Sequence, residues 1–129
     1  MKKTVRSLGY SLTGLSHALK SESNLRRFLL GHIALILLAV YLHIDLFSMV
    51  LLTFAAGFFV TVELLNTAIE RLADTLDDCE KTQRGGHYHP GIKLTKDVAA
   101  AASLIALIVY GATLIVVALP YLIFSFGSL

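Results

Sequence analysis

The chain has 129 residues, of which 56% are hydrophobic, and its mean hydropathy is +0.73. This composition is too apolar for an ordinary soluble domain and favours an integral membrane protein. The net charge is only +2, but all eleven lysines and arginines fall within residues 2–27 and 71–96, and the single cysteine, Cys79, excludes an intrachain disulfide.

The first predicted element is a helix over about residues 4–20. Its apolar side chains recur at steps of three and four residues, as expected for one face of a helix. They are Val5, Leu8, Leu12, Leu15 and Leu19. Basic and polar residues lie mostly elsewhere around the wheel. We therefore predict an amphipathic helix that lies on the membrane surface, in preference to a core-facing helix of a soluble bundle.

Two membrane spans are predicted next, over about residues 27–44 and 46–69. Phe28–Ile44 and Leu46–Val62 each contain seventeen uncharged residues, which gives about 25 Å of helix and is long enough to cross most of a bilayer core. A cluster of small residues at 55–57 would let a neighbouring helix approach closely.

A polar loop is predicted over about residues 75–95, with Gly85, Gly86, Pro90 and Gly91 as breakers. The third span is then predicted over about residues 96–119, and Pro120 is expected to stop or kink it. No charged residue follows Asp97.

The distribution of basic residues predicts the topology. Loops rich in lysine and arginine stay in the cytoplasm, so we expect the N-terminus and the 75–95 loop there. The 44–45 turn and the C-terminus are expected outside. The predicted fold is therefore all-α: one integral membrane domain over 1–129, with an N-terminal surface helix and three transmembrane helices.

One polar line stands out on the second span. Glu63, Asn66 and Glu70 stand at i, i+3 and i+7, so they follow one helix face, and Asp74 continues the line. Glu63 follows seventeen uncharged residues, so it lies at or just inside the membrane boundary, where an ionisable group is costly and usually functional. Glu70 lies about 10 Å nearer the cytoplasm, which suggests that the deep glutamate meets a lipid headgroup and the shallow one meets a cytosolic molecule.

The topology brings Glu22, Glu70, Lys96 and Asp97 to the cytoplasmic surface. Carboxylates and a lysine at this level suit a nucleotide carried by Mg²⁺, which takes oxygen ligands from one or two carboxylates and from phosphates. Lys96 would pair with phosphates, and a glutamate near a lipid hydroxyl would serve as general base. The alternative is that these charges only flank the spans and pair with basic neighbours. The phosphate-binding signatures of soluble kinases, GxxxxGK[ST] and GxGxxG, are absent.

At these residues the sequence resembles the small prokaryotic diacylglycerol kinase family, which includes undecaprenol kinases. The resemblance is carried by four motifs in order, which cover most of the chain. They are Tyr10-Ser11-x-x-Gly14-Leu15, Glu22-x-x-x-Arg26, Glu63-Leu64-Leu65-Asn66-Thr67-Ala68-Ile69-Glu70, and Lys96-Asp97-Val98-Ala99-Ala100.

The resemblance implies a homotrimer with shared active sites at the interface between membrane and cytoplasm, in the bacterial inner membrane. It implies transfer of the γ-phosphate of MgATP to a lipid hydroxyl, with no nucleic acid among the partners. It implies that Glu63 is the catalytic base and that Asn66 supports the catalytic site. It implies that Glu22 and Glu70 bind Mg²⁺ and the nucleotide. It also implies nucleotide contacts by four further residues: Tyr10, His89, Lys96 and Asp97.

Two features depart from the family pattern. Phe28 stands where many members have Glu or His, and the interval from Glu70 to Lys96 is longer than expected. We take diacylglycerol as the expected substrate, with undecaprenol as the alternative because both present a primary hydroxyl near the interface. A further alternative is a non-enzymatic small membrane subunit, although such a subunit would not need the line from Glu63 to Glu70.

Overall fold

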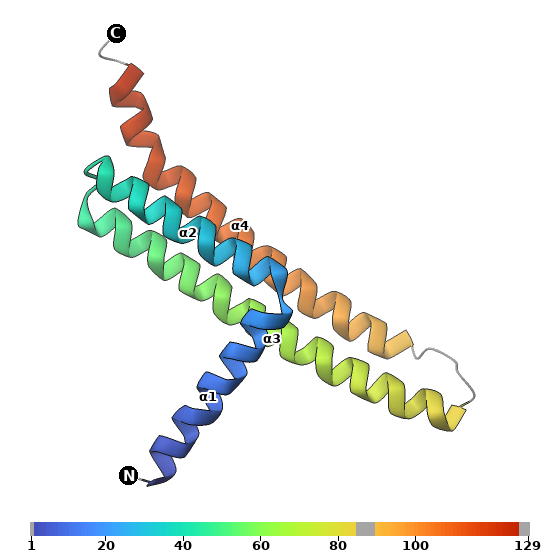
Figure 1. Ribbon diagram of the computed structural model, residues 1–129. Helices are drawn as coiled ribbons and strands as arrows, with labels where there is room; N and C mark the ends of the chain where they lie inside the picture. Colours follow the sequence, from blue (N-terminus) through green and yellow to red (C-terminus); the bar gives the residue numbers. More distant parts are fainter. Residues whose placement is uncertain (1, 85–89, 127–129) are drawn as a thin grey trace.

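The computed structural model describes residues 2–84 and 90–126, and within them the chain forms four α-helices. These are α1 (Lys2–Ser21), α2 (Ser23–Tyr41), α3 (Leu46–Arg84) and α4 (Pro90–Phe126). Helices α2, α3 and α4 run side by side, and α1 leaves the bundle at an angle (Figure 1). The predicted all-α fold, with an N-terminal helix before three apolar ones, is confirmed.

Three of these helices, α2, α3 and α4, are long and apolar enough to cross a membrane. At 1.5 Å per residue α2 is about 28 Å long, whereas α3 with its 39 residues is about 58 Å long and exceeds the hydrocarbon core of a bilayer. Since α2 and α3 meet at a short turn, the excess length of α3 lies at its other end, where α4 begins (Figure 1). The α3–α4 pair therefore projects well past the start of α2.

The predicted loop over residues 75–95 is wrong for most of its length, because α3 continues to Arg84 and α4 begins at Pro90. Apolar side chains of α3 pack across to α4 in this projection: Ile69, Leu72, Ala73 and Leu76 face Ile92 and Thr95 around a small cavity. Pro90 does not break a helix here, since proline is well tolerated in the first turn.

Pro120, which was expected to stop or kink the last helix, does not stop it. Pro120 lies inside α4, which continues to Phe126. The final part of α4, red in Figure 1, runs at an angle to the rest of the helix, as expected at a proline, which removes one backbone hydrogen bond.

The joint between α1 and α2 is a single extended residue, Glu22, with φ −93° and ψ 103°. The Arg26 guanidinium donates to the carbonyl oxygens of Leu19 and Lys20 at 2.9 and 2.6 Å, so it satisfies acceptors that the end of α1 leaves open. The Leu25 side chain is fully buried beneath this joint. The bend that sends α1 out of the bundle is therefore capped and packed.

The turn between α2 and α3 is a Schellman motif. Ile44 N–H donates to Ala39 O at 2.9 Å and His43 N–H donates to Val40 O at 3.1 Å, and His43 takes the left-handed conformation with φ 55°. Asp45 then caps α3: its carboxylate accepts from the Ser48 N–H at 3.0 Å.

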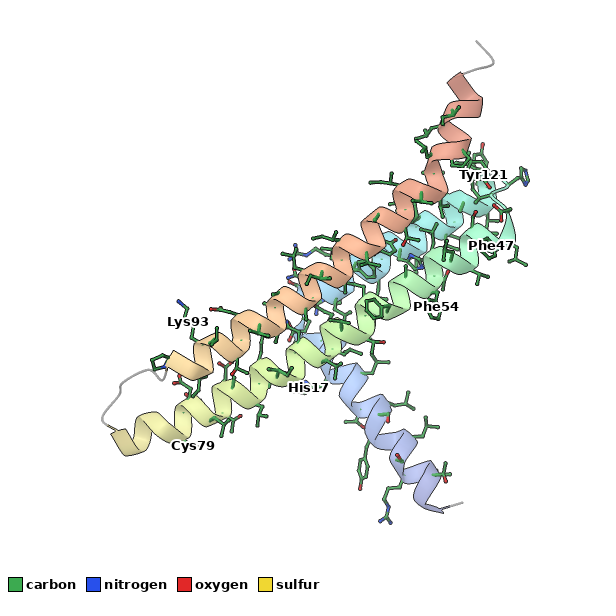
Figure 2. The ribbon with its side chains drawn as sticks, turned by 180° about the vertical axis from the view of Figure 1, so that it is seen from behind. His17, Phe47, Phe54, Cys79, Lys93 and Tyr121 are labelled. Atoms are coloured by element: carbon green, nitrogen blue, oxygen red, sulfur yellow. The ribbon has the colours of Figure 1, made fainter. Side chains whose placement is uncertain are left out.

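A tyrosine fastens α4 to this turn. The Tyr121 hydroxyl donates to Asp45 Oδ2 at 2.6 Å and accepts from the Asp45 N–H at 3.2 Å. Figure 2 shows Tyr121 and Phe47 at one end of the bundle, far from Cys79 and Lys93 at the other. The hydroxyl of Ser48, then that of Tyr121, then the Ser48 N–H lower the pKa of the Asp45 carboxyl from 3.8 to about 2.

We predict that Asp45→Asn lowers thermal stability above about pH 4, and that the difference from wild type disappears as the pH falls toward 2. The sign follows from the lowered pKa: the carboxylate stabilises the folded state fully above its unfolded pKa of 3.8 and loses this effect as pH falls through about 2. The measurement is the melting midpoint in detergent by circular dichroism across this pH range. A difference that stays constant down to pH 2 would contradict the assignment.

Candidate active site

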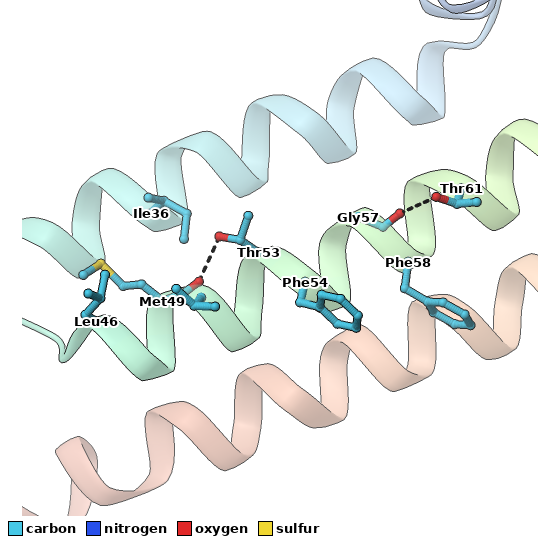
Figure 3. A pocket seen from close by; sticks show the side chains of 9 residues that line it. Ile36, Leu46, Met49, Thr53, Phe54, Gly57, Phe58 and Thr61 are labelled. Carbon is cyan, nitrogen blue, oxygen red and sulfur yellow. Dashed lines mark hydrogen bonds between the residues drawn. The ribbon is translucent and has the colours of Figure 1, made fainter.

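An apolar groove of about 850 Å³ lies along α3 beside Ile36 of α2, and Figure 3 shows its lining. Its polar side chains, Thr53 and Thr61, donate to the carbonyls of Met49 and Gly57 in their own helix, each at 2.8 Å. Both hydroxyls are therefore already satisfied. This groove offers a surface for acyl chains or helices but no group for catalysis.

A second pocket, of about 420 Å³, lies where α2, α3 and α4 meet, and it contains the polar line predicted from the sequence. Glu63, Asn66 and Glu70 all line it from α3. The other lining residues come from all three helices: Asn24, Arg27, Phe28, Phe59, Ala100, Ser103, Leu104 and Leu107. A carboxylate, an amide and a second carboxylate therefore face one cavity that is otherwise largely apolar.

Glu63 is half-buried and is held from α4, because the Ser103 hydroxyl donates a hydrogen bond to Glu63 Oε2. On the side of Glu63 away from Glu70, the Phe28 and Phe59 rings pack with centroids 4.3 Å apart, and Tyr110 meets Phe28 edge-on at 4.9 Å. Phe28 and Phe59 line the pocket on this side. The glutamate therefore lies at the polar end of an apolar compartment, with one oxygen fixed by a neutral donor.

Asn66 lies between the two glutamates along α3 and contacts one of them, Glu70. Its Nδ2 donates to Glu70 Oε1 at 3.2 Å, while its Oδ1 is buried and has no protein partner. A buried acceptor without a partner is costly unless a ligand satisfies it. The amide therefore orients Glu70 and leaves an oxygen that is available to a donor from a bound molecule.

Glu22 lies outside this pocket, at the joint of α1 and α2, but Arg71 connects it to the site. Arg71 follows Glu70 directly in α3, and its guanidinium lies 3.5 Å from Glu22 Oε1. The same group donates to the Ser21 hydroxyl at 2.5 Å, and that hydroxyl donates to Glu22 at 2.9 Å. A cation therefore already sits at the Glu22 carboxylate.

The remaining predicted residues are not gathered into the pocket. Lys96 pairs with Asp74, Nζ to Oδ1 at 2.7 Å, one turn of α3 beyond Glu70. Asp97 is exposed on α4, and Tyr10 on α1 is 71% exposed. His89 lies outside the described residues. The structure thus brings Glu63, Asn66 and Glu70 together, with the two ion pairs close by.

Two participants were missed in the sequence. Ser103 was assigned to a run of small residues for helix packing, although it follows Lys96 by seven residues and so shares its face of α4. Arg71 was treated only as a neighbour for nearby carboxylates. Both contacts depend on which helix faces face each other, and the sequence pattern does not give this tertiary packing.

Known proteins resemble this chain over most of its length. Residues 9–118 match the model of the family described as prokaryotic diacylglycerol kinase. The chain is similar to a diacylglycerol kinase of Helicobacter pylori, with 36% identity over 83% of this chain and 77% of that protein. It is also similar to a diacylglycerol kinase of Escherichia coli, with 32% identity over 83% of this chain and 81% of that protein. A diacylglycerol kinase of Pseudomonas aeruginosa is 32% identical over 88% of this chain and 85% of that protein.

Proposed function

Since the chain belongs to the prokaryotic diacylglycerol kinase family and is a membrane-bound lipid kinase, we propose that it transfers the γ-phosphate of ATP to the primary hydroxyl of diacylglycerol, giving phosphatidic acid. Membership of a kinase family leaves no support for a non-enzymatic subunit. The observation that carries the proposal is the half-buried Glu63 in a pocket that is apolar on its membrane side and polar toward Glu70. That order of surfaces matches a lipid alcohol with its acyl chains on one side and a nucleotide on the other.

Glu63 is proposed as the general base. Its carboxylate would accept the proton of the lipid hydroxyl as that oxygen attacks the γ-phosphorus and the bond to the leaving ADP oxygen breaks. The hydrogen bond from Ser103 to Oε2 fixes the side chain and leaves Oε1 to face the hydroxyl. Proton removal by a positioned base contributes about 10²–10⁴-fold to rate.

Glu70 and Glu22 are proposed to bind Mg²⁺ together with the phosphates of ATP. Within the described residues no three His, Cys, Asp or Glu side chains converge on one point, so an all-protein metal cage is not expected. Mg²⁺ usually takes only one or two carboxylates plus phosphate oxygens, and this donor set fits that pattern. The ion, when bound, would neutralise charge on the transferring phosphoryl group.

Asn66, Lys96, Asp97, Tyr10 and His89 complete the proposed site. Asn66 would hold Glu70 through its Nδ2 and offer its buried Oδ1 to a bound donor. Lys96 would contact phosphates after leaving Asp74. Asp97, Tyr10 and His89 are assigned to nucleotide contact by family analogy alone.

We further propose an N-in, C-out topology in the bacterial inner membrane and a homotrimer with sites shared between subunits. The topology rests on the confinement of every lysine and arginine to residues 2–27 and 71–96. The large exposed apolar surface of α2, α3 and α4, on which only 11–22% of each span is buried, is compatible with contacts to lipid and to further subunits.

The test is a phosphorylation assay with purified protein in mixed micelles, labelled ATP and Mg²⁺, in which diacylglycerol and undecaprenol are offered separately. We expect label in diacylglycerol and little in undecaprenol. Preferential labelling of undecaprenol would shift the assignment to an undecaprenol kinase. Label in neither lipid, from protein whose helical content is intact, would contradict the proposed reaction.

A further inference from the structure

Arg71 occupies a position that the proposed reaction leaves unexplained. It extends from α3, directly after Glu70, to the joint between α1 and α2, where it contacts both the Ser21 hydroxyl and the Glu22 carboxylate. The contact is partly open to solvent, since the side chains of Arg71 and Glu22 are 41% and 32% exposed. The ion pair therefore borders solvent instead of being enclosed in the bundle.

The joint has contacts that stabilise it besides those of Arg71. Arg26 caps the end of α1 through the carbonyls of Leu19 and Lys20, and Leu25 is fully buried beneath the bend. A partly exposed ion pair adds little net stability. The ion pair of Arg71 with Glu22 therefore contributes little to holding α1 against α3.

A second, partly exposed ion pair between a basic residue and a carboxylate lies close by. Lys96 binds Asp74, which follows Arg71 by three residues and so lies about one helical turn along α3. Without nucleotide, both cations are thus held by carboxylates of the protein. MgATP brings a divalent cation and phosphate oxygens together, so carboxylates and cations can exchange partners while every charge remains paired.

We propose that Arg71 is a triphosphate-binding residue that occupies Glu22 until MgATP arrives, and then moves its guanidinium to the phosphate oxygens as the metal takes the carboxylate. The inference rests on the proposed function, in which Glu22 binds Mg²⁺. Arginine suits this exchange because its planar, permanently charged fork binds carboxylate and phosphate in the same two-pronged way. The fork also keeps Glu22 from repelling an incoming triphosphate.

The test compares Arg71→Ala and Arg71→Lys with wild type and with Lys93→Ala, which removes the same charge from an exposed position on α4. Two ligands are titrated separately in detergent: Mn²⁺ alone, followed by electron paramagnetic resonance, and a Mg²⁺ complex of a non-hydrolysable ATP analogue. For Arg71→Ala we expect Mn²⁺ to bind about two- to fivefold more tightly, because its competitor at Glu22 is gone. We expect the nucleotide to bind about tenfold or more weakly. Arg71→Lys should recover part of the nucleotide affinity.

Opposite changes in the affinities for Mn²⁺ and for the nucleotide distinguish this role from a purely structural one. If Arg71 only holds α1 against α3, Mn²⁺ and nucleotide should both bind more weakly, and the inference is overturned. Values equal to those of Lys93→Ala would overturn it as well. If wild type itself binds no nucleotide, the proposed function fails and this inference fails with it, whereas wild-type binding with no effect of Arg71→Ala rejects the inference alone.

Discussion

Replacing Glu63 by glutamine is expected to lower turnover by about 10²–10⁴-fold while nucleotide affinity stays near that of wild type. Glutamine keeps the shape of the side chain and can still accept the hydrogen bond from Ser103, but it cannot take a proton from the lipid hydroxyl. The measurement is kcat with diacylglycerol in mixed micelles, together with equilibrium binding of a non-hydrolysable ATP analogue. Turnover within a few-fold of wild type would show that Glu63 is not the base.

Ser103→Ala serves as the graded control for this result. It removes the donor that orients Glu63 but leaves the carboxylate, so we expect a loss of about tenfold, well below that of Glu63→Gln. Because Ser103 acts through Glu63, the two substitutions should not be additive. A double variant that falls to the product of the two single losses would indicate that Ser103 acts independently.

The helices themselves were largely predictable, because uncharged runs and a 3.6-residue period depend only on the local sequence. The length of α3 and α4 was not. Residues 75–84 look like a loop when judged by polarity, yet Leu76 continues the helical spacing of Ile69 and Leu72 and lines the same cavity as Ile92. The polarity of these positions was mistaken for an end of the helix, although a helix that packs on one face can carry polar residues on its other faces.

The candidate site was also predictable only in part. Glu63, Asn66 and Glu70 were predictable as a line because one helix carries all three. The contacts of Glu63 with Ser103 and of Arg71 with Glu22 join residues 40 and 49 positions apart in the sequence. Such pairs depend on the axial register and rotation of packed helices, which short side-chain patterns do not determine. Motif order suggested which residues share a site but not which pairs touch.

The proposed roles of Glu63 as general base and Glu70 as Mg²⁺ ligand lead to the second large effect. Glu70→Gln is expected to weaken binding of the Mg²⁺–nucleotide complex by about a hundredfold, with a matching loss in kcat/KM. The amide can keep a contact with Asn66, but it removes the charge that would attract the metal. Raising the Mg²⁺ concentration should therefore recover part of the activity of Glu70→Gln and none of that of Glu63→Gln.

The matched control is Asp45→Asn, which removes a carboxylate at the opposite end of the bundle, beside Tyr121. Its affinity for the nucleotide complex should equal that of wild type at neutral pH. The measurement is a titration of the Mg²⁺–analogue complex for all three variants, with activity followed against Mg²⁺ concentration. If Glu70→Gln binds the complex like wild type and loses only turnover, then both glutamates act on the same chemical step. The proposed separation of Glu63 as general base from Glu70 as Mg²⁺ ligand would then be wrong, since a residue about 10 Å from Glu63 along the helix would be taking part in proton transfer or in phosphoryl transfer itself.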